Sequence, residues 1–138
     1  MSYAGDVSPQ EAYRAILDDP EAVIVDVRTR PELVFVGMPD LSAAGKEVVA
    51  IEWQTFPHGT VNTEFVGQLR AAGIVETQNV YFLCRSGGRS RAAAILATAD
   101  GFEAAFNIDA GFEGNPNSLG HRGTEGGWKF AGLPWRQG

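Results

Sequence analysis

Short apolar runs alternate along this chain with longer segments whose apolar residues recur every three or four positions. The run at 22–27 is β-branched and apolar on both faces, which is typical of a strand covered on both sides in a parallel sheet. Similar runs predict further strands at 47–53, 80–83 and 104–108. The longer segments predict helices at 9–17, 62–72 and 90–99, and a single helical turn is expected near 31–33.

The ends of the predicted helices carry capping signals. Ser8 precedes Pro9 at the first helical position, and Glu11 completes a capping box. Gly73 is a C-terminal stop for the second helix. The helix at 90–99 is apolar nearly all round, so we expect it to be deeply buried.

Strands that alternate with helices predict an α/β domain with a mostly parallel sheet and helices on both faces. The chain has 138 residues and shows neither an internal repeat nor a linker, so we expect one domain over 1–138. From residue 111 the composition shifts to Gly, Asn, Glu and His, which predicts a long loop at 111–127. The aromatic residues at 128–136 predict a tail that docks on the domain.

Charge and cysteine count argue against several classes of function. A formal net charge of −6 is unfavourable for general nucleic-acid or anionic-membrane binding. One cysteine cannot form an internal disulfide, and it makes no metal-ligand pattern with His58 and His121, so no metal site is expected. No apolar run is long enough to span a bilayer, and the N-terminus lacks the features of a signal peptide. We therefore expect a cytoplasmic protein.

The stretch from 80 to 97 carries the candidate chemistry. The predicted strand stops at Cys84, and two adjacent glycines, Gly87 and Gly88, precede the helix. Glycines permit backbone angles that other residues resist, so successive N–H groups can point into one anion-binding nest at the helix N-terminus. The cations here are Arg85, Arg89 and Arg91, with no acidic residue among them. In parallel α/β sheets ligands bind at the carboxyl ends of strands, which is where Cys84 is predicted to lie.

This environment favours a reactive cysteine. The thiolate is the nucleophilic form, and nearby cations and helix N-termini stabilise it. A lone cysteine can also be a small apolar residue at a strand end. Packing alone, however, requires neither the glycine pair nor the arginines that flank Cys84. A non-covalent phosphate loop is a second alternative, but the Gly-x-x-x-x-Gly-Lys-Ser/Thr pattern is absent.

Two further groups of residues lie between the first two predicted strands or at their ends. Asp26 and Arg28 stand at the end of the strand at 22–27, where we interpret them as structural support through a salt bridge or a turn cap. The apolar residues within 33–38 must pack against the domain or line a cleft.

Three stretches of this chain resemble the rhodanese family of sulfurtransferases, and the resemblance extends from about residue 7 to the end. Val25-Asp26-Val27-Arg28 is similar to the family's Asp-Val-Arg signature. Cys84-Arg85-Ser86-Gly87-Gly88-Arg89-Ser90 resembles its active loop, Cys-x-x-Gly-x-Arg-Ser/Thr. The segment from 111–114 to Trp128 and 132–135 is similar to the end of many single-domain bacterial members. The chain departs at 35–41, where many members have Gly-His-Ile-x-Gly-Ala and only the glycine is retained.

The resemblance implies both a fold and an activity. The fold would be a five-stranded parallel sheet of order 3-2-4-5-1 between helices. The Cys84 thiolate would take the outer sulfur of thiosulfate or another persulfide donor, carry it as a persulfide and pass it to cyanide or a thiol acceptor. No cofactor is implied beyond this transient cysteine persulfide. Arg85 and Arg89 would receive the anionic donor, within a substrate-binding loop made of Arg85, Ser86, Gly87, Gly88, Arg89 and Ser90.

Two other classes of function stay open. A cysteine phosphatase or arsenate reductase uses a similar nest and nucleophile, but with five residues between Cys and Arg, whereas four lie between Cys84 and Arg89. A rhodanese-like binding or sulfur-relay module would act with a specific protein partner. Binding modules of that kind commonly lack the cysteine that this chain keeps.

Overall fold

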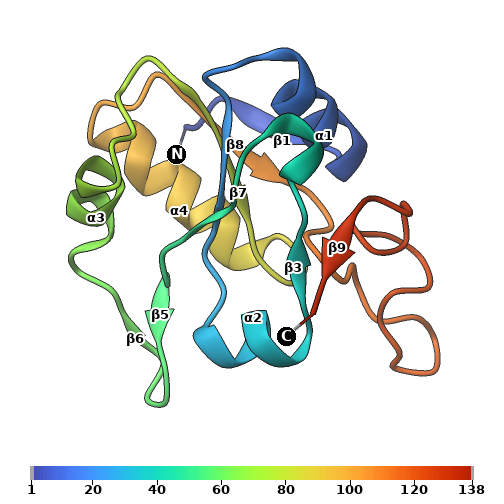
Figure 1. Cartoon of the computed structure of the whole chain (residues 1–138). Coiled ribbons are helices and arrows are strands. Elements are labelled where there is room, and N and C mark those ends of the chain that lie inside the picture. The colour runs from blue at the N-terminus through green and yellow to red at the C-terminus, as the bar shows by residue number, and fades with distance from the viewer. Residues whose placement is uncertain (1, 138) are drawn as a thin grey trace.

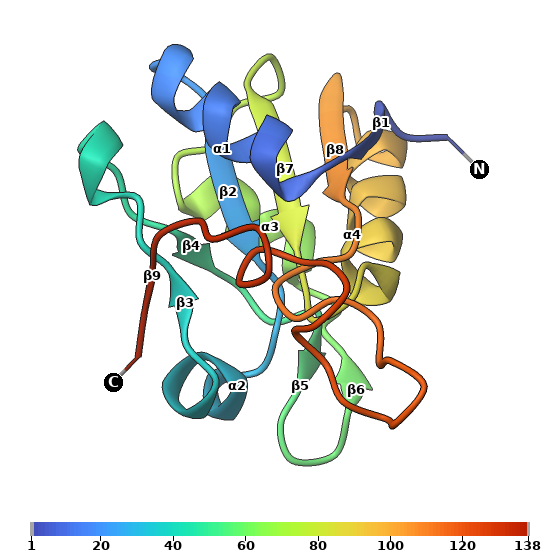
Figure 2. The same ribbon diagram turned by 90° about the vertical axis from the view of Figure 1, so that its right-hand side faces the viewer.

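The computed structural model describes residues 2–137 and places a five-stranded parallel sheet between two covering layers (Figures 1 and 2). Across the sheet the strands run in the order β1 (Gly5–Val7), β8 (Ala104–Ile108), β7 (Asn79–Leu83), β2 (Val23–Asp26) and β4 (Val49–Ala50). Counted along the chain, these five strands read 3-2-4-5-1 from the β4 edge. The α/β fold and the predicted strand order are confirmed.

Each face of the sheet buries its own apolar cluster. Helices α3 (Phe65–Ala71) and α4 (Gly88–Ala99) cover one face, where Phe65 packs against Phe82. Helix α1 (Pro9–Asp18) and the 3₁₀ helix η1 (Ser42–Ala44) cover the other face together with the segment that follows β8. The second cluster includes Ile16, Ile24, Leu83, Phe112 and Trp128.

Helix starts follow the predicted capping chemistry. The Ser8 hydroxyl accepts a hydrogen bond from the Glu11 N–H at 3.0 Å, and the Glu11 carboxylate accepts one from the Ser8 N–H at 2.9 Å, as a capping box requires. The expected helical turn near 31–33 is helix α2 (Arg30–Phe35). Among residues 2–137, none of the helices is both long and apolar enough to cross a membrane.

Two predicted elements differ from the structure, and several short strands were not predicted. The strand expected at 47–53 shrinks to β4. The backbone of Ile51 and Trp53 still donates hydrogen bonds to Asp26 and Val27 beyond β4, and both side chains pack on the core. The chain then forms an antiparallel hairpin of β5 (Gln54–Thr55) and β6 (Thr60–Val61). Strand β1, which pairs with β8, has too few apolar residues to show in the sequence pattern. Helix α3 begins at Phe65, because the Asn62 side chain accepts a hydrogen bond from the Glu64 N–H in a preceding turn.

Helix α4 is not buried all round, contrary to the prediction. Its buried face is formed by Ser90 and three alanines, which lie against the sheet. Leu96 on the other side is 40% exposed. Small side chains on the sheet side let the helix approach closely, whereas Ala92 and Ile95 are only half-buried and Ala99 is exposed.

The C-terminal segment crosses the carboxyl end of the sheet and ends in strand β9 (Trp135–Arg136), which pairs antiparallel with β3 (Met38–Pro39) (Figure 2). Trp128 is completely buried, and its indole N–H donates to the Pro134 carbonyl at 2.7 Å. Phe130 stays 56% exposed, so the aromatic residues of this tail do not all pack inward.

Candidate active site

Cys84 follows β7 directly, at the carboxyl edge of the sheet. Its side chain is 1% exposed, and its Sγ accepts a hydrogen bond from the Gly87 N–H at 3.1 Å. The Ser90 hydroxyl oxygen lies 3.2 Å from the same sulfur atom. Gly87 makes this turn with a φ of +114°, a conformation that favours glycine, and α4 begins at the next residue. The sulfur atom is therefore held at the N-terminal end of α4.

The segment after β8 supports the Cys84 loop through backbone contacts. The Phe112 N–H donates to the Cys84 carbonyl at 2.9 Å, and the Glu113 N–H donates to the Arg85 carbonyl at 2.9 Å. Gly111 has a φ of +60°, and a Cβ at this position would lie 2.5 Å from the Cys84 carbonyl oxygen. Only glycine fits this close approach, which accounts for the glycine at the start of the third resembling stretch.

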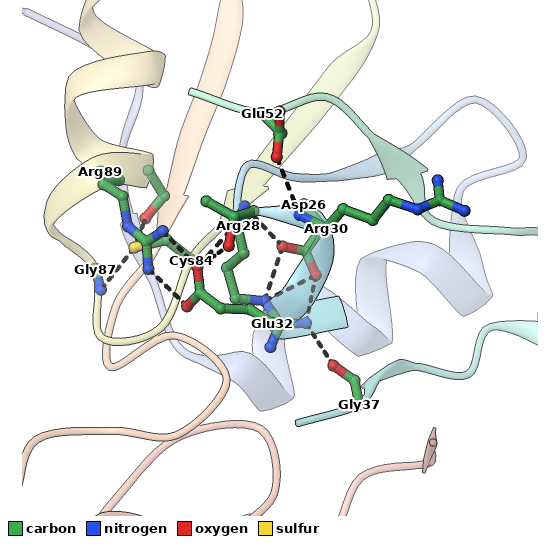
Figure 3. A network of polar contacts seen from close by, with 11 residues as sticks. Asp26, Arg28, Arg30, Glu32, Gly37, Glu52, Cys84, Gly87 and Arg89 are labelled. Atoms are coloured by element: carbon green, nitrogen blue, oxygen red, sulfur yellow. Dashed lines mark hydrogen bonds and ion pairs between the residues drawn. The ribbon is translucent and has the colours of Figure 1, made fainter. Parts of the chain in front are cut away.

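Arg89 is held by an acidic residue that the sequence did not reveal. Its guanidinium forms two hydrogen bonds with the Glu32 carboxylate, at 2.8 and 3.0 Å, and both side chains are 22% exposed (Figure 3). Burial alone would raise the pKa of Glu32, but hydrogen bonds from Arg89 and Thr29 outweigh burial and hold this pKa at about 2. The pKa of Arg89 is raised, first by its hydrogen bonds to Glu32 and to a smaller extent by the charges of Glu32 and Asp26. The Arg89 charge is thus neutralised next to the sulfur atom.

The other residues of the predicted loop have different environments. Arg85 is exposed and, within residues 2–137, takes part in no ion pair. Gly88 is exposed, Ser86 is half-buried and Ser90 is fully buried. Arg91 lies over the Tyr3 ring at 5.9 Å. The loop residues come together as predicted, but of the two predicted donor-binding arginines only Arg85 lies open to solvent without a carboxylate partner.

Asp26 and Arg28 form a fully buried ion pair at the end of β2. Arg28 Nη2 lies 2.7 Å from Asp26 Oδ2, and Arg28 Nε donates to Asp26 Oδ1 at 2.9 Å. Arg28 Nη2 also donates to the Gly37 carbonyl at 2.7 Å (Figure 3). The guanidinium lies 4.4 Å from the centre of the Phe112 ring, where a cation–π contact forms. These contacts tie β2 to the segments around Gly37 and Phe112, and the Phe112 N–H in turn donates to the Cys84 carbonyl.

The segment at 35–41, which departs from the rhodanese pattern, packs against the C-terminal tail. A Cβ on Gly37 would lie 2.8 Å from the Trp135 ring, so the retained glycine makes room for this side chain. The apolar residues nearby do not all pack inward. Phe35 is 75% exposed, Val34 is 43% exposed, and together with Phe56, which is 63% exposed, they border an open hollow of about 480 Å³. We call Val34, Phe35 and Phe56 the α2 patch.

Sequence reasoning missed three residues that are linked to Cys84. Glu32 stands three positions after Thr29, a capping spacing, but its contact with Arg89 spans 57 residues and left no local signal. Asn107 is a polar residue inside the apolar strand β8, and it accepts a hydrogen bond from Ser90. Asp6 on β1 in turn accepts a hydrogen bond from Asn107. Asn107, a polar residue within a mostly buried strand, was the one sequence signal that could have pointed to this group.

The fold and the site together define a rhodanese-like domain of the sulfurtransferase class. The chain belongs to the family described as the STR4 middle domain, whose model matches residues 4–138. It is 36% identical over 129 residues to the uncharacterized protein RC0915 of Rickettsia conorii, covering 91% of this chain and 92% of that protein. It is also 32% identical to the chloroplastic protein Thylakoid Rhodanese-Like of Oryza sativa, covering 95% of this chain but 25% of that protein.

Solved structures give the same picture. The crystal structure of Rv0390 from M. tuberculosis superposes with a TM-score of 0.90 at 50% identity, over 99% of this chain and 100% of that chain. The polysulfide-sulfur transferase homodimer of Wolinella succinogenes has a TM-score of 0.64 at 21% identity, over 96% of this chain and 78% of that chain. At that identity the second likeness concerns the fold alone.

Proposed function

We propose that this protein transfers a sulfane sulfur through a persulfide on Cys84. The observation that carries the proposal is the position of Cys84, whose Sγ accepts the Gly87 N–H at 3.1 Å at the start of α4. This position suits a thiolate that gains and loses one further sulfur atom, because backbone N–H groups and the helix N-terminus favour negative charge there.

In the first half-reaction the Cys84 thiolate attacks the outer sulfur of a donor, for which thiosulfate is the model. A new S–S bond forms at Sγ, the S–S bond of thiosulfate breaks, and sulfite leaves with the bonding electron pair. The thiolate and the thiosulfate dianion give a persulfide anion and a sulfite dianion, so charge balances. Covalent catalysis in two halves predicts ping-pong kinetics.

In the second half-reaction an acceptor takes the outer sulfur of the persulfide. Cyanide attacks that sulfur, the Cys84 S–S bond breaks, and thiocyanate leaves while the Cys84 thiolate is restored. A thiol acceptor follows the same course after losing its proton to water. No metal or organic cofactor takes part in either half-reaction.

The charged residues around the loop support sulfur transfer over phosphoryl transfer. Arg85 is exposed and attracts an anionic donor to the loop. Arg89 is bound by the Glu32 carboxylate at 2.8 and 3.0 Å, so the pair offers little net positive charge to a phosphoryl dianion. A cysteine phosphatase relies on cations at this position to stabilise the charge of its transition state.

The experiment that tests the proposal is the intact mass of the protein after incubation with thiosulfate, measured beside the Cys84→Ser variant. We expect a gain of one sulfur atom, which is lost on adding cyanide and absent in the variant. A wild-type protein that gains no sulfur from thiosulfate or from a glutathione persulfide would contradict it. Hydrolysis of an aryl phosphate that depends on Cys84 would then favour the phosphatase alternative.

A second candidate function is sulfur relay to a protein acceptor, and the α2 patch favours it. Phe35 and Phe56 are large apolar side chains that face solvent, and contiguous exposed apolar groups often mark interaction sites. The patch borders the same helix that carries Glu32, the partner of Arg89. A protein thiol that docked on this surface would approach the end of the sheet where Cys84 lies (Figure 2).

The relay function can be separated from simple turnover with the Phe35→Ser variant. Both proteins are loaded with sulfur from thiosulfate and then discharged to cyanide and to a reduced dithiol protein such as thioredoxin. A docking role predicts unchanged discharge to cyanide and slower discharge to the dithiol protein. If wild type and Phe35→Ser discharge at the same rate to the dithiol protein as well as to cyanide, the patch has no docking role, and the relay function is contradicted.

A further inference from the structure

A chain of hydrogen bonds leads from Cys84 to the surface carboxylate of Asp6. The Ser90 hydroxyl lies 3.2 Å from Cys84 Sγ and 2.6 Å from Asn107 Oδ1. Asn107 Nδ2 donates to Asp6 Oδ1 at 3.0 Å, and the Tyr3 hydroxyl donates to the same oxygen at 2.7 Å. Ser90 is fully buried and Asn107 is 3% exposed. These hydrogen bonds join α4, β8 and β1. The sheet register holds Asn107 beside Asp6, because the two residues are partners in the pairing of β8 with β1.

The donors and acceptors of this chain can be satisfied in only one order while Asp6 is ionised. A carboxylate only accepts hydrogen bonds, so Asn107 must turn its amide N–H₂ toward Asp6 and its Oδ1 toward Ser90. The Ser90 hydroxyl has one hydrogen atom, which it donates to Asn107 Oδ1. Its oxygen then faces Cys84 as an acceptor, so the sulfur can contribute only its own proton to this contact.

We propose that Asp6 and Asn107 are positioning residues that hold the Ser90 hydroxyl as an acceptor toward Cys84, and so favour the protonated thiol in the resting protein. When Cys84 ionises, its proton passes to solvent water. Ser90 can turn its hydrogen to the thiolate only by giving up its hydrogen bond to Asn107. The competition for one hydroxyl hydrogen sets how readily the nucleophile forms.

The other charged groups near Cys84 are largely paired or exposed. Arg89 is bound by Glu32, and Arg28 is bound by Asp26, so each pair contributes little net charge. Three exposed charged groups also lie near these residues: Arg85 in the loop, Asp109 after β8, and Arg91. Hydrogen bonds from Tyr3 and Asn107 lower the pKa of Asp6, and the charge of Arg91 lowers it further. The carboxylate oxygen of Asp109 would lie 3.7 Å from a Cβ placed on Gly87. Asp109 is therefore a nearby carboxylate outside the hydrogen-bond chain.

The test measures the rate of alkylation of Cys84 by iodoacetamide as a function of pH. Asn107→Leu changes no charge and removes the acceptor, so Ser90 is free to donate to the thiolate. We expect the pH midpoint of alkylation to fall by about one unit, because a hydrogen bond to a charged group shifts an ionisation equilibrium by roughly tenfold. Asp6→Asn should lower the midpoint in the same direction, because the amide of Asn107 can then turn round.

Asp109→Asn is the matched control, since it removes a nearby carboxylate without touching the chain. A midpoint that falls as far in Asp109→Asn as in Asp6→Asn would show a general charge effect and overturn the proposal. An unchanged or raised midpoint in folded Asn107→Leu would overturn it as well. If Asn107→Leu does not fold, the comparison of the two aspartate variants decides.

The inference shares with the proposed function the assumption that Cys84 is the reacting group, but alkylation does not require sulfur transfer. A lowered midpoint in a protein that gains no sulfur from any donor would uphold the positioning role and contradict the proposed function. Normal sulfur loading with unshifted midpoints of alkylation would support the proposed function and contradict the positioning role.

Discussion

Glu32 and Arg89 form a bidentate ion pair next to the Cys84 loop, with contacts of 2.8 and 3.0 Å (Figure 3). The pair joins α2 to α4 across 57 residues of sequence. Its consequence for function is electrostatic. Of the three arginines at 85–91, Arg89 is neutralised by Glu32, whereas Arg85 and Arg91 are exposed. Arg85 is the exposed cation within the loop itself, since Arg91 lies in α4.

Replacing Glu32 should therefore make an anionic donor bind better. In Glu32→Gln the Arg89 charge is no longer neutralised, and one additional unpaired charge near the surface is worth about 1 kcal/mol, or roughly fivefold in KM. We expect a lower KM for thiosulfate, and this gain should shrink at high salt. Steady-state kinetics with thiosulfate and cyanide measure it.

Arg85→Ala is the opposing variant in the same assay. It removes the exposed cation, so KM for thiosulfate should rise by a similar factor, while discharge of a preformed persulfide to cyanide should change less. A higher KM in Glu32→Gln would mean that Glu32 serves to orient Arg89 toward the donor, which would contradict the expectation.

The same pair predicts how the stability of the fold depends on pH. The pKa of Glu32 is lowered from its ordinary value of 4.5 to about 2 in the folded protein, so ionisation of Glu32 stabilises the folded state. The stabilisation is fully present above about pH 4.5 and is lost as the pH falls toward 2; it amounts to at most about 3 kcal/mol. Urea unfolding at pH 7 and pH 3 should show a gap between wild type and Glu32→Gln that narrows in acid. The exposed Glu103 provides the control, since Glu103→Gln should show no such gap.

Local patterns were sufficient to predict the chemistry at Cys84 but not the contacts that adjust it. Cys84, Gly87 and the start of α4 are contiguous in sequence, so composition and turn chemistry located them. The strand order came from the family resemblance rather than from the residues. Glu32, Asn107 and Asp6 reach the site through tertiary contacts, which no local periodicity encodes.

Edges of the sheet were the least predictable part of the fold. Strands β1 and β4 pair on one side only and are short, so they need few apolar residues and leave a weak pattern. The surface hairpin β5–β6 packs little into the core, and nothing in its composition separates it from a loop. Central strands β7 and β2 are buried on both faces and were found from their apolar runs.

Gly111→Ala should damage both the fold and the site. Its φ is +60°, and the new Cβ would lie 2.5 Å from the Cys84 carbonyl oxygen, so the loop must move. We expect a loss of more than about 2 kcal/mol in the free energy of unfolding and slower sulfur loading of Cys84. Gly120→Ala is the matched control, because Gly120 has a φ of +79° with open space around it. It should cost about 1 kcal/mol and leave sulfur loading unchanged. Similar losses in the two variants would show that backbone conformation alone matters at Gly111.

Breaking the Asp26–Arg28 pair should be the most destabilising of these changes. Both side chains are fully buried, so Arg28→Met leaves the Asp26 carboxylate without its guanidinium partner, at a cost of about 3–5 kcal/mol. The double change Asp26→Leu with Arg28→Met removes both charges and should cost less than the sum of the single changes.

Urea unfolding of the single and double variants measures this coupling directly. Arg70→Met is the control, because Arg70 is 40% exposed and forms ion pairs with Glu76 and Asp100, whose side chains are 46% and 55% exposed. An exposed pair of this kind contributes at most about 1 kcal/mol, since solvent screens it. If Arg28→Met destabilises the protein no more than Arg70→Met, the buried pair is not what holds β2 against the segments that frame Cys84. The frame would then depend on the contact between Phe112 and its apolar neighbours instead.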